Sequence, residues 1–261
     1  SYGIWSEGDV LPGYVNRAGA GSRVDVLSDG THDGSEWSVT FRRKLDTGDA
    51  TGDIVFAAGG SYYFQVATFD NTGGAGHDTS DANNVYGMTI PAAPGPLVFS
   101  STPTSLTSLT GDLLTTGEIE IVAKWADTTR NDARKQWQYM SGAWSQSADN
   151  EDRLAIIWDM QNDGFVTSGN CTVMCHPPLM YTEPGTTVDT WHYKASRTGH
   201  AGFTDDKWWD DGDGGNQSGR LSDSGQSVYM DNDDDNGHPE FMSSAGASTS
   251  ATALMERDSA P

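Results

Sequence analysis

The stretch "EIEIVAKW" (residues 118–125) alternates apolar and polar side chains with a period of two. Its mainly apolar members fall on one face of an extended chain: Ile119, Ile121, Ala123 and Trp125. This alternation is typical of a β-strand that has one buried and one solvated face. The stretch therefore predicts a strand of an antiparallel sheet.

The same period recurs elsewhere in the chain, and the helical period of 3.6 residues hardly occurs. "EWSVTFRR" (36–43) and "SYYFQVATFD" (61–70) alternate in this way, and "DRLAIIWDM" (152–160) is a more apolar run that predicts a central strand. Gly-, Asp- and Asn-rich turns such as "DTGDATGD" (46–53) separate these segments. The fold class expected is mainly β, an antiparallel β-sandwich with long acidic loops and little helix.

Composition divides the chain into four parts. Residues 1–91 and 118–242 are β-rich, and the Pro/Ser/Thr-rich stretch 92–117 is expected to link them. "DDKWWDDGDGGNQSG" (205–219) and "DNDDDNGHPEF" (231–241) are expected to be acidic loops. Residues 243–261 are low in complexity and predict a surface tail or linker.

The charge balance limits the classes of partner. Asp and Glu number 37 against 15 Lys and Arg, for a net charge of −22 over 261 residues. Such a field repels nucleic acids and anionic membranes and attracts cations. No apolar run approaches the roughly 18 residues of a membrane span. We therefore expect neither nucleic-acid binding nor membrane insertion, and an extracellular or periplasmic location.

The two cysteines lie in "SGNCTVMCHPPLM" (168–180), where Cys171, Cys175 and His176 form C-x-x-x-C-H. Covalent attachment of haem c uses two thiols and a histidine directly after the second, which binds the iron. The usual spacing leaves two residues between the thiols, and here there are three. From the residues alone, a small disulfide loop, a metal site and a pair of free thiols remain open as alternatives.

Four segments in this order resemble the haem-binding domain of the ethylbenzene dehydrogenase type, which haem subunits of the DMSO-reductase superfamily and c-type cytochrome relatives share. They are "EIEIVAKWADTTRND" (118–132), "DNEDRLAIIWDM" (149–160), "GNCTVMCH" (169–176) and "VDTWHYKASRTGHAGFTDD" (188–206). In that family these segments surround the haem, and relatives with covalent haem carry C-x-x-x-C-H. The resemblance thus implies one haem c on Cys171 and Cys175, with His176 as an axial ligand.

The N-terminal part resembles the far end of the same family domain. Residues 21–49, 53–71 and 76–90 look like its closing strands, which in the family follow the attachment half and here precede it. Three explanations fit this permuted order: a circular permutant, one unit of a tandem array, or the donation of residues 1–91 to a neighbouring subunit. The last would give self-association through exchanged halves, and a filament if the contacts do not close.

The resemblance also gives candidates for the other groups around the haem. His77 stands where haem b relatives have a ligating lysine, so it is the expected second axial ligand, with His192 and then Met180 as alternatives. Lys194 and Arg197 are expected partners of the haem propionates. Each of these residues could equally be a histidine or cation of ordinary structural role.

The acidic loops suggest calcium. Asn232, Asp234 and Asn236 fit the start of a calcium loop, with Glu240 nearby, although Ser243 stands where the last ligand of that motif is expected. Residues 205–215 are a second candidate. A solvated acidic loop without an ion is the alternative at both places.

The sequence offers no convincing catalytic constellation, so we expect an electron carrier and not an enzyme. The function expected is an electron-transfer c-type cytochrome domain with one covalent haem, redox partner proteins and self-association into an extracellular filament. One alternative is a haem subunit that passes electrons from a periplasmic molybdenum enzyme. The other is a calcium-dependent adhesive or carbohydrate-binding β-sandwich without a redox role.

Overall fold

The alternating stretch forms β10 (Glu118–Ala126), the middle strand of a five-stranded antiparallel sheet. It pairs along nine residues with β4 (Glu36–Lys44), from Glu118 opposite Lys44 to Ala126 opposite Glu36. The strand order is β3 (Leu27–His32), β4, β10, β9 (Ser108–Leu113) and β7 (Gly95–Pro96). The computed structural model describes residues 5–72, 77–78, 81, 83–169, 181–212, 220–234 and 236–240.

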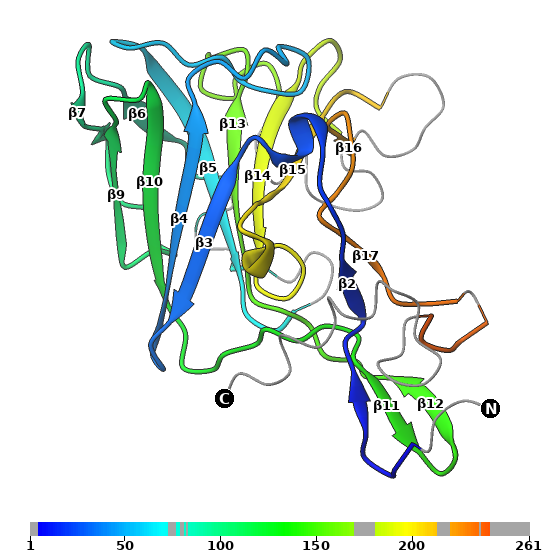
Figure 1. Ribbon diagram of the computed structural model, residues 1–261. Coiled ribbons are helices and arrows are strands. Elements are labelled where there is room, and N and C mark those ends of the chain that lie inside the picture. Colours follow the sequence, from blue (N-terminus) through cyan, green and yellow to red (C-terminus); the bar gives the residue numbers. More distant parts are fainter. Residues whose placement is uncertain are drawn as a thin grey trace.

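A seven-stranded sheet packs against the five-stranded one (Figure 1). Its order is β16 (Arg220–Ser222), β15 (Asp205–Trp209), β14 (Val188–Lys194), β13 (Arg153–Asp159), β5 (Ser61–Phe69), β6 (Tyr86–Thr89) and β8 (Val98–Phe99). Each pairing between neighbours is antiparallel. The predicted antiparallel β-sandwich is confirmed.

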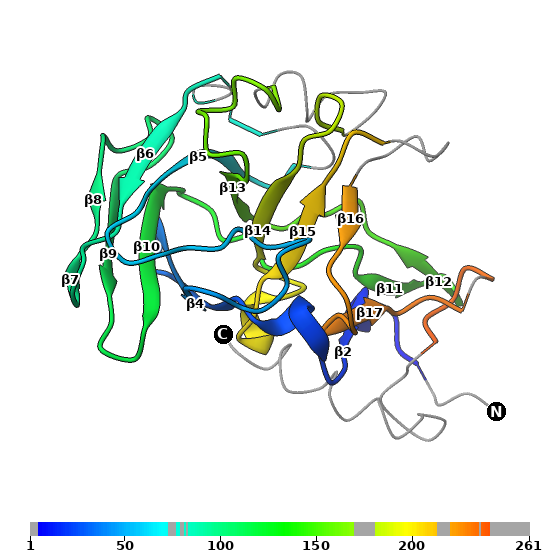
Figure 2. The same cartoon turned by 90° about the horizontal axis from the view of Figure 1, so that it is seen from above.

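Two small sheets lie beside the sandwich. β1 (Val10–Leu11), β11 (Trp137–Met140) and β12 (Ala143–Gln146) form one, and β2 (Tyr14–Asn16) pairs with β17 (Tyr229–Asp231) in the other. In Figures 1 and 2, β11 and β12 project away from the large sheets. The helical turns η1 (Gly21–Val24) and η2 (Gly199–Ala201) are short, and no helix among the described residues is long and apolar enough to cross a membrane.

The core lies between the two large sheets, and aromatic side chains make up much of it. Trp158 and Trp191 on the seven-stranded sheet lie with their ring centroids 5.1 Å apart, and Phe56 packs edge-on against both. From the five-stranded sheet, Phe41 reaches Trp191, with centroids 6.2 Å apart. Aromatic packing of this kind supplies large buried area with defined geometry, which fixes how the sheets stack.

A buried ion pair also joins the sheets. Arg43 on β4 and Asp189 on β14 have fully buried side chains, and an Nη atom of Arg43 lies 3.0 Å from a carboxylate oxygen of Asp189. The same guanidinium donates to the carbonyl of Ile54 at 2.6 Å and lies over the rings of Phe56 and Trp191. Loss of one partner would leave a charge inside the core, which is strongly destabilising.

The structure differs from two sequence-based expectations about loops. Residues 92–117, expected as a linker, contribute β7, β8 and β9, because their leucines enter the core: Leu97, Leu106, Leu109 and Leu113. Residues 205–209, expected as part of an acidic loop, form β15. Its buried aspartates face Arg43 on one side of the strand and Lys194 on the other, so the charges do not prevent burial.

The two β-rich halves interleave within one chain. β4 from the first half pairs with β10 from the second, and β5 pairs with β13. Both large sheets therefore contain strands from either side of residues 92–117. Within the described residues, one copy of the chain supplies the strands of both large sheets.

Asp81 connects the strand pair β5–β6 to the segment before β9. Its buried carboxylate accepts hydrogen bonds from the Tyr86 hydroxyl, from the backbone N–H and hydroxyl of Thr104, and from the backbone N–H of Ser105. Burial alone would raise the pKa of Asp81, but the hydrogen bonds from Ser105, Tyr86 and Thr104 outweigh it and hold the pKa well below its ordinary value.

We predict that Asp81→Asn lowers the free energy of unfolding by about 2–3 kcal/mol at pH 7, because several charge-assisted hydrogen bonds are lost. A depressed folded-state pKa stabilises the fold above the ordinary aspartate pKa, and this stability is lost as the pH falls below about 4. Urea titrations at pH 7 and pH 3 should thus show a smaller difference between variant and parent at pH 3. Asp112→Asn, at an exposed position, is the control and should change little. If Asp81→Asn lowered the free energy of unfolding equally at both pH values, the stabilising role of the charged Asp81 carboxylate would be contradicted.

Candidate functional site

The seven-stranded sheet is buried on both of its faces at its centre. Every residue of β13 is buried, and in β5 and β14 burial likewise does not alternate over most of the strand. In the five-stranded sheet, by contrast, β4 and β10 alternate between buried and more exposed residues, as expected of an outer layer. The face of β5, β13 and β14 that points away from the sandwich core is therefore covered, and we call it the outer face.

Small side chains lie at the middle of the outer face. Ala155 on β13 stands directly opposite Ala67 on β5 and His192 on β14, so the three share one face. Ala67 and Ala155 form a buried cluster with Phe69. Two neighbouring alanines leave a low, apolar floor bordered by an aromatic ring and an imidazole.

A second apolar cluster on the outer face includes the chain segment that joins β13 to β14. Phe165 in this segment packs with Ile157, Val188 and Trp209. Further on, the Ser168 carbonyl accepts the Glu183 backbone N–H at 3.1 Å. The chain thus leaves after residue 169 and returns at residue 181 beside its point of departure.

The cysteines belong to this connection. Cys171, Cys175 and His176 lie outside the described residues, as does Met180, so their predicted roles stay predictions. Their neighbours in the chain, Ser168 and Glu183, are held together by the hydrogen bond just described. The connection therefore starts and ends next to the outer face, and its length of 11 undescribed residues limits how far from that face the cysteines can lie.

The two histidines proposed as axial ligands are brought to one place. The ring of Phe69 lies with its centroid 5.6 Å from that of His77 and 5.8 Å from that of His192. The first contact comes from the loop after β5, and the second from β14. The structure therefore places both residues at the same end of the outer face, although they are 115 positions apart in sequence.

His192 has the properties of an uncharged nitrogen ligand for a metal. The residue is half-buried, but its Nε2 atom is buried and finds no hydrogen-bond partner among the described residues. Burial, together with the charges of Lys194 and Arg153, lowers the pKa of His192 well below its ordinary value. At neutral pH the imidazole is uncharged, which is the form that binds metals.

Lys194 and Arg197, expected to bind propionates, have carboxylate partners inside the protein. Lys194 pairs with Asp205, and its side chain is almost fully buried. The Nε of Arg197 donates to Glu151 at 2.5 Å, and its guanidinium lies over the rings of Tyr14 and Tyr229. Their described contacts are structural, and a role toward propionates stays a prediction.

The residues expected to bind calcium in 231–241 serve the local fold. Asn232 is buried and its side chain donates to the carbonyl of Pro12 at 2.8 Å. Asp234 accepts the backbone N–H groups of Asn236 and His238, at 2.9 and 3.0 Å. Glu240 is exposed. A calcium ion at this loop stays a prediction.

The comparisons with known proteins place the chain in a family. The family model described as ethylbenzene dehydrogenase matches residues 1–80 and 81–260. The chain belongs to the ethylbenzene dehydrogenase family. No curated protein and no solved structure gives a significant match.

Segments that carried the resemblance to the ethylbenzene dehydrogenase family meet at one end of the sandwich. Asp152, in the run before β13, accepts the indole N–H of Trp37 at 2.9 Å and the backbone N–H of Asn131 at 2.7 Å. Its other oxygen accepts the backbone N–H of Asn71 at 3.1 Å. One buried carboxylate therefore orders parts of three segments that are far apart in the sequence.

Residues that the sequence analysis missed complete the outer face of this family member. Arg153 lies with its guanidinium 4.0 Å from the centroid of Phe69 and donates to the carbonyl of Thr72 at 2.5 Å. Arg153 therefore holds two things in place: the ring of Phe69, which contacts both histidines, and the loop that carries His77. The one signal in the sequence is the apolar, non-alternating run around Ala155, which predicts a strand covered on both faces.

We predict that Lys194→Met lowers the free energy of unfolding by about 3 kcal/mol, because it removes a partner of the buried Asp205 carboxylate. Burial alone would raise the pKa of Asp205, but Lys194 and Lys207 hold it well below its ordinary range, so the charge remains. Chemical denaturation measures the change. Lys124→Met, at a half-exposed ion pair with Glu36, is the matched control and should cost less than about 1 kcal/mol. Equal stability of the two variants would show that Lys194 is not a structural partner of Asp205.

Proposed function

We propose that this member of the ethylbenzene dehydrogenase family is an electron-transfer subunit that carries one haem c against the outer face of its seven-stranded sheet. Cys171 and Cys175 would hold the haem, and His176 would be one axial ligand. The observation that carries the proposal is the covered outer face, where a buried imidazole nitrogen without a described partner borders a floor of alanines.

The chemistry of the outer face fits a flat, apolar macrocycle. Ala67 and Ala155 give this face a smooth apolar surface, and the rings of Phe69 and Trp209 belong to the two apolar clusters there. The connection that carries Cys171 and Cys175 begins and ends at this face. When bound, a haem supplies reversible one-electron chemistry, and the residues around it set its potential and shield it from water.

His77 is proposed as the second axial ligand, with His192 as the alternative. Both histidines pack on Phe69, so either imidazole lies beside the outer face where the haem is proposed to bind. If His176 and one of these histidines both held the iron, no coordination position would be left for a substrate. This coordination favours a carrier of electrons over an enzyme.

Family membership favours a place in a larger redox complex. A subunit that accepts electrons from a molybdenum enzyme outside the cytoplasm is therefore the second candidate function. In either case the net charge of −22 favours redox partners with a basic docking surface and increases the rate of encounter at low salt. The two candidate functions share the haem and differ in the redox partner.

An adhesive or carbohydrate-binding sandwich is the alternative of a different class. Such a module would have no haem, and its two cysteines would be free or joined in a disulfide. Self-association into a filament is a separate proposal, which rests on the permuted order of the two family halves in the sequence.

We predict that the mature protein carries one covalently attached haem. Its intact mass should exceed the polypeptide mass by one haem, and the pyridine haemochrome spectrum should be that of haem c. Cys175→Ser should abolish the second thioether bond and leave the spectrum shifted toward that of a singly attached haem. A mass equal to the polypeptide with an intramolecular disulfide would contradict the proposal.

We predict a low-spin, six-coordinate iron without the charge-transfer band of a Met–iron bond. His77→Ala should convert it to high spin, because one axial nitrogen is lost, and His238→Ala, in an exposed loop, should leave the spectrum unchanged. Absorption and electron paramagnetic resonance spectra measure the spin state. An unchanged spectrum in His77→Ala together with a high-spin His192→Ala variant would assign the ligand to His192 instead.

A further inference from the structure

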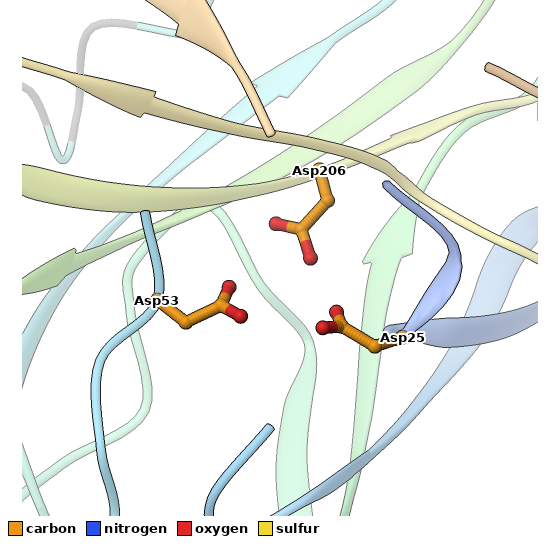
Figure 3. Close-up of side chains that lie close together, drawn as sticks. All are labelled: Asp25, Asp53 and Asp206. Carbon is orange, nitrogen blue, oxygen red and sulfur yellow. The ribbon is translucent and has the colours of Figure 1, made fainter. Parts of the chain in front are cut away.

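A group of carboxylates lies on the core side of β15, the opposite face of the sheet from His192 and Lys194. Asp25, Asp53 and Asp206 each bring one oxygen to within 4.8 Å of the others. They come from the turn after η1, from the loop between β4 and β5, and from β15. Figure 3 shows the three carboxyl groups pointing toward a common centre.

The oxygens of this group lack compensating donors. Asp206 is fully buried, and neither of its carboxylate oxygens has a hydrogen-bond partner among the described residues. The same holds for both oxygens of Asp223, which is 3% exposed, and for one oxygen each of Asp25 and Asp53. Buried carboxylates without donors are costly, so such a group requires either bound protons or a cation.

The positive charge near these carboxylates is too small to neutralise them. Arg43 is the cation that faces the group, and it lies 3.0 Å from Asp189 and 3.9 Å from Asp53. Asp189 already accepts Arg43, the Ile54 backbone N–H and the Trp191 indole N–H through one oxygen. One guanidinium therefore faces four carboxylates, those of Asp25, Asp53, Asp189 and Asp206. Asp223 adds a fifth negative group beside Asp53 and Asp25.

A glycine lets the carboxylate of Asp223 approach. A Cβ atom added to Gly52 would lie 2.3 Å from an oxygen of Asp223 and 2.9 Å from Trp208. Any other residue at position 52 would displace Asp223.

We propose that Asp25, Asp53 and Asp206 form a structural calcium site, beside which Asp223 adds negative charge. The donors are all oxygens, which are the ligands of hard cations, and the mutual separations of these three groups suit metal–oxygen distances of roughly 2.3–2.6 Å. Calcium fits better than magnesium, because magnesium retains several waters and two of these three carboxylates are almost fully buried. The ion would join the segment before β3, the β4–β5 loop and the β15–β16 edge of the seven-stranded sheet.

The other three-carboxylate group in the described part of the chain is Asp70, Asp127 and Asp152. There, both oxygens of Asp152 accept hydrogen bonds, and Asp70 is exposed. That group holds one buried oxygen without a described partner, Oδ2 of Asp127, whereas Asp25, Asp53 and Asp206 together hold four. A fully buried carboxylate with both oxygens unpartnered, that of Asp206, therefore distinguishes this group from the other.

The test uses the purified full-length chain with its native cofactor content. After desalting, elemental analysis should find one calcium per chain, and EGTA should lower the Tm, with CaCl2 restoring it and MgCl2 restoring it less. Terbium chloride added to EGTA-treated protein should give sensitised luminescence, because Trp208 lies beside the site, and CaCl2 should suppress it. This measurement needs no variant and so does not depend on how well a variant folds.

Variants locate the ion. Asp206→Asn should weaken calcium binding, measured by calorimetry, by about tenfold or more, since ligand charge tunes the affinity of such sites. Asp112→Asn, at an exposed position, is the control and should bind calcium as the parent does, and Asp234→Asn tests the other acidic loop. No retained calcium and a Tm insensitive to EGTA and CaCl2 would overturn the proposal in favour of a protonated carboxyl cluster. Loss of binding in Asp234→Asn but not in Asp206→Asn would move the ion to residues 232–240.

Discussion

The burial of the seven-stranded sheet on both faces is the constraint from which the rest of the structure follows. Its inner face packs on the five-stranded sheet through Trp158 and Trp191, and its outer face is covered at Ala155. Charged groups on β14 and β15 must therefore find partners within the protein. The pairs Arg43–Asp189 and Lys194–Asp205 meet this requirement on the two faces.

Successive side chains of β14 point to opposite faces of the sheet, so this one strand carries residues of both proposed sites. Asp189 and Trp191 point into the core, toward Arg43 and the buried carboxylates, whereas His192 and Lys194 stand in register with Ala155 and Arg153 across the sheet. The proposed haem face and the proposed calcium site thus share a rigid strand. A structural ion on the inner side would hold β15 and the β4–β5 loop in place, and so steady the strand that carries His192.

The strands could be predicted where local alternation carries the information. Residues 118–125 and 36–43 alternate because one face of the five-stranded sheet is solvated, and the structure pairs them as β10 and β4. β9 in the stretch 92–117 was not predicted, because Ser and Thr are common both in linkers and on exposed strand faces. β15 was missed because its Asp205 pairs with Arg23 and Lys194, which are distant in sequence, and no local pattern reveals such pairs. For the same reason the convergence of Asp25, Asp53 and Asp206 could not be foreseen.

The central claim is that a haem lies against the outer face of the seven-stranded sheet. A crystal structure with anomalous diffraction recorded at the iron edge tests it most directly. The account predicts one iron peak per chain on the outer face of β13 and β14, bonded to His176, with His77 or His192 as the opposite ligand. An iron peak at any other surface, or electron density for a Cys171–Cys175 disulfide with no iron, would contradict it.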